Sequence, residues 1–437
     1  MRLKELLPLI YEKNIDERRI LMGIAELLSK YDENFWDFSG VKKEGIHKIG
    51  KYPATMVAPM QYELLSLLVS NNKKFQTLLD PFMGSGTSLI EGYNLNLKVF
   101  GIDINPYAVL LGEVKTHRYH EDDLCEMNER VTKKLLSSNF VYEIHEFPNI
   151  DKWFREDIKK SLSKIRKIII EEENIWIRKF LWICLSEVIY THSNDRTSTF
   201  KLHAKTDEDI AAIKNNCIES FGKIMGKNQK LLIKANAPDI TIYSGDSTNV
   251  LRKIDDNSID IICTSPPYGD NSTTVTYGQA SILFLKWIVF EDLICEESLL
   301  SNYSKIDRES LGGKSNENEF PNIESAQGYI NRLSDGKKRK VIKFISDYYS
   351  VIEQLVRVLS VGGYMLFTVG NRRVDDIIQP LDKITKEIFL QLGLKEEKIF
   401  TRNILSKKMP PKVSNVKNKG SVNSMNKETI LIFKKEQ

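Results

Sequence analysis

The sequence has few cysteines, and none of them are paired at a metal-binding spacing. Its five cysteines, at positions 125, 184, 217, 263 and 295, include no Cys-x-x-Cys pair, which argues against a zinc site and against a disulfide framework. No apolar run approaches the length of a membrane span, and the start, Met-Arg-Leu-Lys-Glu, lacks a signal-peptide pattern. We therefore expect a cytoplasmic protein with no metal and no membrane partner.

Net charge is also low, because 63 Lys and Arg residues stand against 59 Asp and Glu residues, a formal charge of +4. The total gives little sign of a nucleic-acid partner, so the local distribution of charge matters more. A chain of 437 residues is too long for one compact core, which favours a catalytic domain that carries insertions.

What the sequence does have is a rigid corner after an apolar strand. The run Ile259 to Cys263 predicts a buried strand, and Ser265-Pro266-Pro267-Tyr268 follows it. The two prolines fix their own φ and keep the preceding residue out of the helical region. Open α/β sheets bind ligands at the carboxyl ends of their strands, and this corner offers a hydroxyl, carbonyls and an aromatic ring. Taken alone, the segment is better explained as a surface turn or a proline-rich docking motif.

A glycine turn earlier in the chain changes that balance. A strand ending at Asp80 leads into Pro81-Phe82-Met83-Gly84-Ser85-Gly86-Thr87 and then a predicted helix, 88–93. Glycines let a backbone turn tightly and approach a ligand. The next strand, 99–103, ends in Asp103, about twenty residues after the turn, where a carboxylate typically accepts hydrogen bonds from ribose hydroxyls. A glycine pair alone is a weak signal, but this ordered set is a strong one.

These segments together resemble the site-specific DNA amino-methyltransferases, which methylate the exocyclic nitrogen of adenine or cytosine with S-adenosyl-L-methionine. The stretch 80–87 is similar to the family's cofactor motif, Asp103-Ile104-Asn105-Pro106 to its ribose-binding segment, and 265–268 to its catalytic tetrapeptide. The stretch 51–59 resembles the segment that covers the methionine end of the cofactor. The resemblance extends from about residue 45 to the end, with further matches at 243–247, 359–369 and 402–433.

The resemblance implies site residues. The implied catalytic residues are Ser265, Pro266, Pro267 and Tyr268. The implied residues for S-adenosyl-L-methionine are Tyr52, Pro53, Asp80, Pro81, Phe82, Gly84, Ser85, Gly86, Thr87, Asp103, Ile104, Asp246 and Ser247.

Basic and hydroxyl-rich segments are candidate DNA contacts. They are 337–340, the tail 402–435 and the loop 191–201, whose side chains suit phosphates and base edges. Solvated surface charge and a capping loop are the alternative explanations. The candidate DNA-binding residues are Ser193, Arg196, Lys201, Asp270, Asn271, Lys337, Lys338, Arg339, Arg402, Lys407 and Lys408.

Seven apolar segments predict an α/β fold with a doubly wound sheet. They begin near Phe75 and continue at 99–103, 239–243, 259–263, 364–369, about 395–401 and 429–433. The resemblance implies a class I S-adenosylmethionine-dependent methyltransferase fold in which the last strand is antiparallel.

Long stretches between the predicted strands define the expected domains. Residues 1–44 form an N-terminal helical segment with an apolar stripe at Leu6, Ile10, Ile20, Ile24 and Leu28. The catalytic domain comprises 45–117 and 238–437. The stretch 118–237 is a helical insertion and the candidate DNA-recognition lobe, with helices expected at 158–171, 176–190 and 206–225. The polar stretch 290–340 is a second insertion, expected near the target base.

The residue before Pro-Pro-Tyr bears on the target base. In the family that this chain resembles, Ser occurs there mainly in cytosine-N4 enzymes, and Asp or Asn mainly in adenine-N6 enzymes. The resemblance therefore favours cytosine N4 in duplex DNA, reached by base flipping, in a restriction-modification or related defence system. Because we find no endonuclease signature, a cognate restriction endonuclease would be a separate partner. The alternatives are adenine-N6 methylation, a substrate RNA or protein glutamine, and a catalytically silent binding module.

Overall fold

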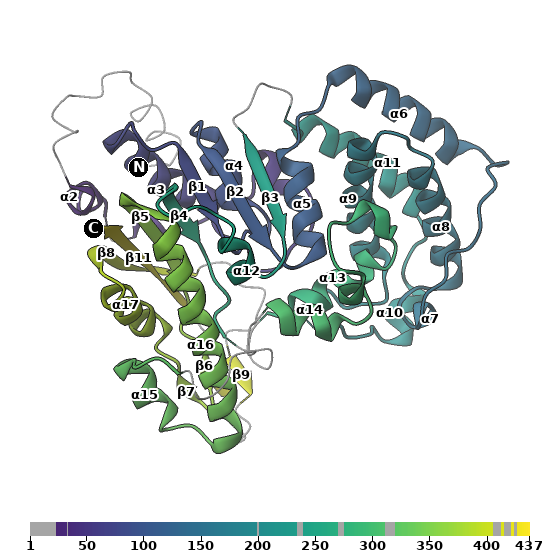
Figure 1. Cartoon of the computed structure of the whole chain (residues 1–437). Helices are drawn as coiled ribbons and strands as arrows, with labels where there is room; N and C mark the ends of the chain where they lie inside the picture. The colour runs from purple at the N-terminus through teal and green to yellow at the C-terminus, as the bar shows by residue number, and fades with distance from the viewer. Residues whose placement is uncertain are drawn as a thin grey trace.

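A seven-stranded sheet forms the centre of the protein, in the order β3-β2-β1-β4-β5-β11-β8 (Figure 1). The structure is a computed structural model that describes residues 23–32, 34–198, 201–233, 239–269, 275–310, 320–404, 412–414, 421–423 and 426–437. The strands are β1 (Thr77–Asp80), β2 (Lys98–Asp103), β3 (Ile240–Ser244), β4 (Ile259–Thr264), β5 (Leu359–Val369), β8 (Leu394–Asn403) and β11 (Lys427–Lys435).

The direction of the strands decides where a site can form. From β3 to β5 the neighbouring strands are parallel, whereas β11 runs antiparallel to both β5 and β8. The seven predicted strands and the reversed last strand are thus confirmed, and the chain has the class I methyltransferase fold. Because β11 is reversed, its first residues lie at the edge where the parallel strands end.

Helices cover both faces of the sheet because successive strand residues point to opposite sides. Leu79, Ile262 and Phe367 pack against α16 and α17 in one apolar cluster. Their neighbours Leu78 and Ile261 pack against α3 in another. The helices next to the sheet are α2 (Ile24–Leu28), α3 (Ala58–Asn71), α4 (Thr87–Asn94), α5 (Pro106–Thr116), α12 (Ser247–Leu251), α16 (Asp335–Val358) and α17 (Leu381–Gln391).

A helical lobe follows β2 in the chain and stands beside α5, at the β3 end of the sheet (Figure 1). The expected helices at 158–171 and 176–190 are confirmed as α8 and α9, whereas α6 was not predicted. Helix α9 is buried along most of its length, so it forms the centre of the lobe. The lobe helices are α6 (Glu121–Leu136), α7 (Ile150–Trp153), α8 (Glu156–Ile170), α9 (Ile175–His192), α10 (Asp207–Ala211) and α11 (Cys217–Asn228).

The expected single helix at 206–225 is wrong, since two helices, α10 and α11, occupy that stretch. The break falls at two asparagines whose side chains bind elsewhere. Asn215 Nδ2 donates to the carbonyl of Asp157 at 2.9 Å, and Asn216 Oδ1 lies 2.7 Å from His192 Nε2. Asparagine favours caps and turns over helix interiors for this reason.

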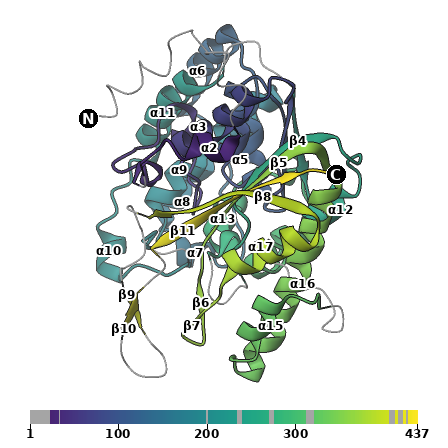
Figure 2. The same ribbon diagram turned by 90° about the vertical axis from the view of Figure 1, so that its left-hand side faces the viewer.

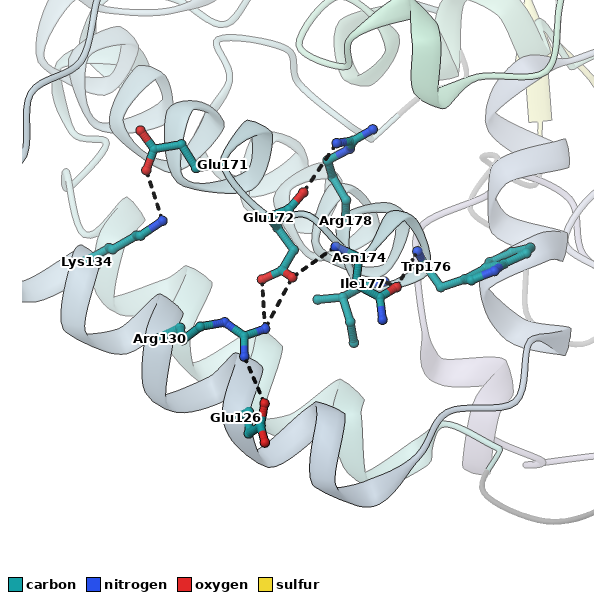
Figure 3. Close-up of polar contacts among 9 residues, drawn as sticks. All are labelled: Glu126, Arg130, Lys134, Glu171, Glu172, Asn174, Trp176, Ile177 and Arg178. Carbon is teal, nitrogen blue, oxygen red and sulfur yellow. Dashed lines mark hydrogen bonds and ion pairs between the residues drawn. The ribbon is translucent and has the colours of Figure 1, made fainter.

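Polar contacts fix α6 against the turn between α8 and α9 (Figure 3). Arg130 donates to both carboxylate oxygens of Glu172 at 3.2 Å, and Lys134 pairs with Glu171 at 2.9 Å. Asn174 caps α9 by accepting hydrogen bonds from the backbone of its first turn. Charged side chains therefore hold the lobe together at its surface, where the apolar core ends.

The second insertion joins the lobe to the sheet. Helix α13 (Tyr277–Leu285), just before the insertion, packs against α9 of the lobe, and α14 (Tyr303–Ser310) packs against α13. Helix α15 (Glu324–Ile330) packs near α16 and α17. Asp292 ties this segment to α9, because its carboxylate accepts from Trp182 Nε1 at 2.6 Å and from Arg178. Helix α16 begins at Asp335, so the basic run 337–340 lies in its first turns.

Smaller elements complete the fold. The strands β6 (Arg373–Val374) and β7 (Ile377–Ile378), and the strands β9 (Lys412–Ser414) and β10 (Ser421–Asn423), form two hairpins that project on the same side as α15 (Figure 2). The 3₁₀ helices are η2 (Phe35–Asp37), η3 (Gly45–Lys48), η4 (Gln229–Leu231), η5 (Phe290–Asp292) and η6 (Glu297–Leu300).

Only part of the predicted N-terminal stripe can be followed. Ile24 and Leu28 are buried on α2, whereas Leu6, Ile10 and Ile20 lie outside the described residues. In the ranges that the structure describes, no helix has the length and apolar character to cross a membrane.

Candidate active site

A cavity of about 500 Å³ opens where the parallel strands end. Gly84 and Ser85 of the glycine turn line one part of it, and Ser265 and Pro267 of the diproline corner line another. Two loops that are far apart in the sequence therefore face the same space. They meet because β1 and β4, which carry them, are adjacent strands in the sheet.

A hydrogen bond beneath the cavity joins these two loops. Thr264 Oγ1, just before the tetrapeptide, donates to Asp80 Oδ1 at 2.6 Å. The same oxygen accepts from the backbone N–H of Phe82 at 3.1 Å. Burial raises the pKa of Asp80 to about 6, although the hydrogen bonds from Thr264 and Phe82 oppose this shift. Asp80 is fully buried, so it acts as a support under the turn.

The glycine turn needs glycine at two positions. Gly84 has φ +47° and Gly86 has φ +75°, the left-handed region that other residues adopt at a cost. A Cβ on Gly84 would lie 3.1 Å from Tyr52 Cε1. The buried Lys115 supports the turn from below, donating from Nζ to the carbonyl of Ser85 at 2.9 Å. Burial lowers the pKa of Lys115 to about 7.

Asp103 lies at the end of β2 and lines the cavity. Its carboxylate accepts from the backbone N–H of Gly84 at 2.9 Å and of Asn105 at 2.8 Å. Burial raises its pKa to about 6. A carboxylate has about four acceptor positions, so the backbone donors leave acceptor capacity for a ligand hydroxyl.

Two stacked tyrosines form another wall. The rings of Tyr52 and Tyr277 are 5.6 Å apart between centroids and inclined by 23°, and both residues line the cavity. Pro53 follows Tyr52 and is half-buried. Tyr277 begins α13, which lies between the diproline corner and the second insertion, so the wall combines segments from distant parts of the chain.

The segment after β3 closes the cofactor side. Asp246 caps α12 by accepting from the N–H of Asn249 at 3.1 Å. Ser247 Oγ donates to the carbonyl of Pro81 at 2.6 Å. The predicted cofactor residues that line the cavity are Tyr52, Phe82, Gly84, Ser85, Thr87, Asp103, Ile104, Asp246 and Ser247.

The tetrapeptide forms hydrogen bonds on the side of the reversed strand. Ser265 Oγ lies 2.9 Å from Tyr268 Oη, which in turn lies 3.3 Å from Glu428 Oε1. Burial raises the pKa of Tyr268 well above its ordinary value. Pro266 is buried. Sequence reasoning missed Glu428, because its closeness depends on β11 running against its neighbours.

Several predicted DNA-binding residues lie at the surface. Arg196 and Arg339 are exposed, and so is Lys201. On the first turns of α16, Lys337 is half-buried, and Lys338 pairs with Asp335 at 3.2 Å. Asp270, Asn271, Lys407 and Lys408 lie outside the described residues.

Two other predicted DNA-binding residues are directed into the protein. Ser193 is 1% exposed, and its carbonyl accepts from Lys205 Nζ at 2.6 Å. Arg402 is 7% exposed, pairs with Glu428 at 2.6 Å and also donates to the carbonyl of Trp36 at 3.0 Å. The sequence around Arg402 is basic, and it gave no indication that this side chain points into the protein.

Two helices, α14 of the second insertion and α16 after it, contribute lining residues that no motif indicated. Glu309 and Ser310 come from α14, and Asp347, Tyr348 and Val351 come from α16. Over the ranges with described placement, no group of three or more His, Cys, Asp or Glu side chains could hold a metal ion.

A class I fold whose glycine turn, strand-end aspartate and diproline corner share one cavity defines a methyltransferase. The sequence model of the family described as DNA methylase, which groups N6 and N4 enzymes, matches residues 10–113. The Type II methyltransferase M.MvaI of Kocuria varians is 30% identical over 420 residues, covering 90% of this chain and 91% of that protein. The Type II methyltransferase M.BsoBI of Geobacillus stearothermophilus is 21% identical over 451 residues, covering 90% and 87%. The chain therefore belongs to the site-specific DNA amino-methyltransferases, and its cofactor is S-adenosyl-L-methionine.

Proposed function

We propose that this DNA methyltransferase transfers the methyl group to N4 of cytosine in duplex DNA. The observation that carries the proposal is the hydroxyl of Ser265, which lines the same cavity as the glycine turn. A serine before Pro-Pro-Tyr is typical of cytosine-N4 enzymes in the family. Adenine N6 is the second candidate, because the two bases offer an amino group on similar ring edges.

The residues of the cavity fit the cofactor. The bend at Gly84 and Gly86 leaves open a space that a Cβ on Gly84 would narrow toward Tyr52. Asp103 retains acceptor positions for the ribose hydroxyls, and Asp246 and Ser247 contact the adenine. Bound S-adenosyl-L-methionine supplies an electrophilic methyl group. The turn and Tyr52 hold that methyl group toward Ser265.

The tetrapeptide orients the target base. An amino group in a base pair cannot reach the cavity, so the base rotates out of the duplex at an unstacking cost of a few kcal/mol. Tyr268 stacks on the extruded base. Ser265 Oγ and the carbonyl of Pro266 accept the two amino hydrogens, which directs the nitrogen lone pair at the methyl group. Serine is a poor base at neutral pH, so positioning is the main catalytic device.

The two insertions bind DNA. We assign sequence recognition to the helical lobe, 118–237, and cover of the target base to 290–340, whose α14 brings Glu309 and Ser310 to the cavity. The exposed side chains of Arg196, Lys201 and Arg339 support phosphate contacts. The catalytic domain then comprises 45–117 and 238–437, and 1–44 is a separate N-terminal segment.

The biological setting that we propose is restriction-modification. The relatives at 30% and 21% identity are named Type II methyltransferases. A separate restriction endonuclease with the same recognition sequence would then be the partner, and this chain would protect the host DNA from it.

Identification of the methylated nucleoside tests the proposal. DNA methylated by the purified protein is digested to nucleosides and analysed by mass spectrometry, with Ser265→Ala protein as the control. N4-methylcytosine is the expected product, and N6-methyladenine would overturn the choice of base. Competition between duplex DNA and RNA for tritiated methyl groups tests the duplex, because preferential labelling of RNA would contradict it.

A further inference from the structure

A chain of hydrogen bonds runs from the cavity to the reversed strand. Ser265 Oγ is 2.9 Å from Tyr268 Oη, and Tyr268 donates to Glu428 Oε1 at 3.3 Å. The other carboxylate oxygen of Glu428 accepts from Arg402 Nη1 at 2.6 Å. Arg402 and Glu428 are directly opposite each other in the register of β8 and β11. The chain is thus anchored in the sheet at its far end.

This anchor fixes the direction of every hydrogen bond in the chain. Arginine has only donors and an ionised glutamate only acceptors, so Glu428 accepts from both Arg402 and Tyr268. Burial and the nearby Glu428 raise the pKa of Tyr268 well above its ordinary value, so the phenol keeps its one hydrogen. Since that hydrogen goes to Glu428, Tyr268 Oη accepts from Ser265. Ser265 is left with lone pairs alone to offer to the cavity that it lines.

A serine hydroxyl by itself cannot tell an amino group from a carbonyl, because it both donates and accepts. Cytosine and uracil differ at this place, since cytosine carries an N4 amino donor and uracil an O4 acceptor. A serine whose hydrogen is already committed distinguishes them. The carbonyl of Pro266 accepts in any case, so it is the part of the discrimination contributed by Ser265 that originates outside the tetrapeptide.

We propose that Glu428 is a positioning residue that makes Ser265 an obligate hydrogen-bond acceptor and so selects a target base with an amino group over one with a carbonyl. The inference rests on the proposed function and deepens it, because it concerns which base that same site accepts. It also gives the inward-facing Arg402 a role in base selection through Glu428.

Two substitutions separate this role from a structural one. In Glu428→Gln, Arg402 requires the amide oxygen as its acceptor, so the amide NH₂ faces Tyr268. The whole chain then reverses, and Ser265 donates to the cavity. In Glu428→Ala the direction is left open. Glu436→Gln is the matched control, because Glu436 is an exposed carboxylate just after β11 that pairs with Lys395.

The experiment measures binding of the full-length variants to two duplexes that carry the recognition sequence found by methylation sequencing. The target position holds cytosine in one duplex and uracil in the other, and S-adenosyl-L-homocysteine is present so that no turnover occurs. We expect the wild-type protein and Glu436→Gln to prefer cytosine by about tenfold or more. Glu428→Ala should weaken the preference, and Glu428→Gln should weaken it further, because only the carbonyl of Pro266 then still requires an amino hydrogen. The cost of extruding each base is the same for every protein, so it cancels between variants.

The order of the two variants decides the question. If Glu428 only stabilised the fold, the isosteric glutamine would be milder than alanine in every measurement, and that order would overturn the proposal. An unchanged preference in Glu428→Gln, with a normal thermal unfolding profile, would overturn it as well. An error in the proposed target base is detected separately, by the identity of the wild-type product. If the wild-type product is N6-methyladenine, the same comparison is made with adenine and hypoxanthine, which also differ by an amino group and a carbonyl.

Discussion

Thr264 and Asp80 are joined by a 2.6 Å hydrogen bond under the two loops of the active site. Each residue comes directly before one of the loops, and both are buried. The hydrogen bond therefore fixes the diproline corner relative to the glycine turn. Asp80 lowers the stability of the folded protein when it is ionised, because burial disfavours its charged form.

Replacing Asp80 should change how stability depends on pH. Burial raises the pKa of Asp80 from 3.8 to about 6, so the folded chain holds this proton more tightly than the unfolded chain. The contribution is complete below about pH 4 and is lost as the pH rises to about 6. In Asp80→Asn, the amide oxygen can still accept from Thr264, and no charge forms.

The free energy of unfolding of Asp80→Asn minus that of the wild type should thus rise by about 2 kcal/mol between pH 4 and pH 7. Urea unfolding of the cofactor-free proteins over this range measures the difference. Parallel curves for the two proteins would show that Asp80 does not titrate in this window.

Removing the hydroxyl of Ser265 should impair turnover without impairing cofactor binding. Ser265→Ala loses an acceptor for the amino group, so the nitrogen is misaligned, and we expect kcat to fall about 100-fold. Ser258→Ala is the control, because Ser258 is an exposed serine at the other end of the same strand whose Oγ bonds the carbonyl of Asp255. Calorimetry should give both variants the wild-type affinity for S-adenosyl-L-methionine. Turnover near the wild-type rate in Ser265→Ala would remove its orienting role.

Two alanine substitutions in the glycine turn should differ in their effect on cofactor affinity. Both Gly84 and Gly86 have positive φ, so each alanine costs about 1 kcal/mol of strain. Only at Gly84 does the new Cβ come within 3.1 Å of Tyr52, whereas at Gly86 the nearest atom is 3.9 Å away. We expect Gly84→Ala to weaken cofactor binding more than Gly86→Ala at similar loss of stability. Equal cofactor affinities of the two variants would show that the Tyr52 ring moves aside without a cost to binding.

Substitutions of Arg402 and Arg339 should change different properties of the protein. Replacing Arg402 should lower stability, and replacing Arg339 should weaken DNA binding. Arg402→Met leaves Glu428 without its ion-pair partner in a largely buried place, so the free energy of unfolding should fall by about 3 kcal/mol or more. Arg339→Ala changes an exposed residue of α16 and should lower the slope of log K against log salt for DNA binding by about one. A slope that changes with Arg402→Met instead would restore Arg402 as a phosphate contact.

The sheet was predictable because each strand is an apolar run between loops with distinctive residues. Strands buried on both faces, such as β4, have few polar positions to obscure the pattern, and in β4 only Asp260 interrupts the apolar run before Thr264. The cofactor turn was predictable for a related reason, since a glycine with positive φ and a carboxylate at a strand end are local requirements of the backbone. At Gly84 and Asp103, the residues that the motif singles out are the ones that the geometry of the cavity requires.

The rest of the cavity could not be predicted because it depends on contacts between distant segments. Tyr277 lines the wall through its stacking on Tyr52, and Glu428 reaches the tetrapeptide through the reversed direction of β11. Arg402 shows the opposite error, because a basic residue in a basic tail pairs inward with a neighbouring strand. Sequence spacing carries no information about such pairs, since they form only when the sheet assembles.

The reversal of β11 has a consequence for biosynthesis. Residues 427–435 insert between β5 and β8, which are already part of the nascent chain when β11 is made. The glycine turn and the tetrapeptide can form early, but Ser265 has no link to Glu428 until β11 has left the ribosome. Methylation activity should therefore begin only once β11 has been made and has inserted between β5 and β8, however early the cofactor loop folds.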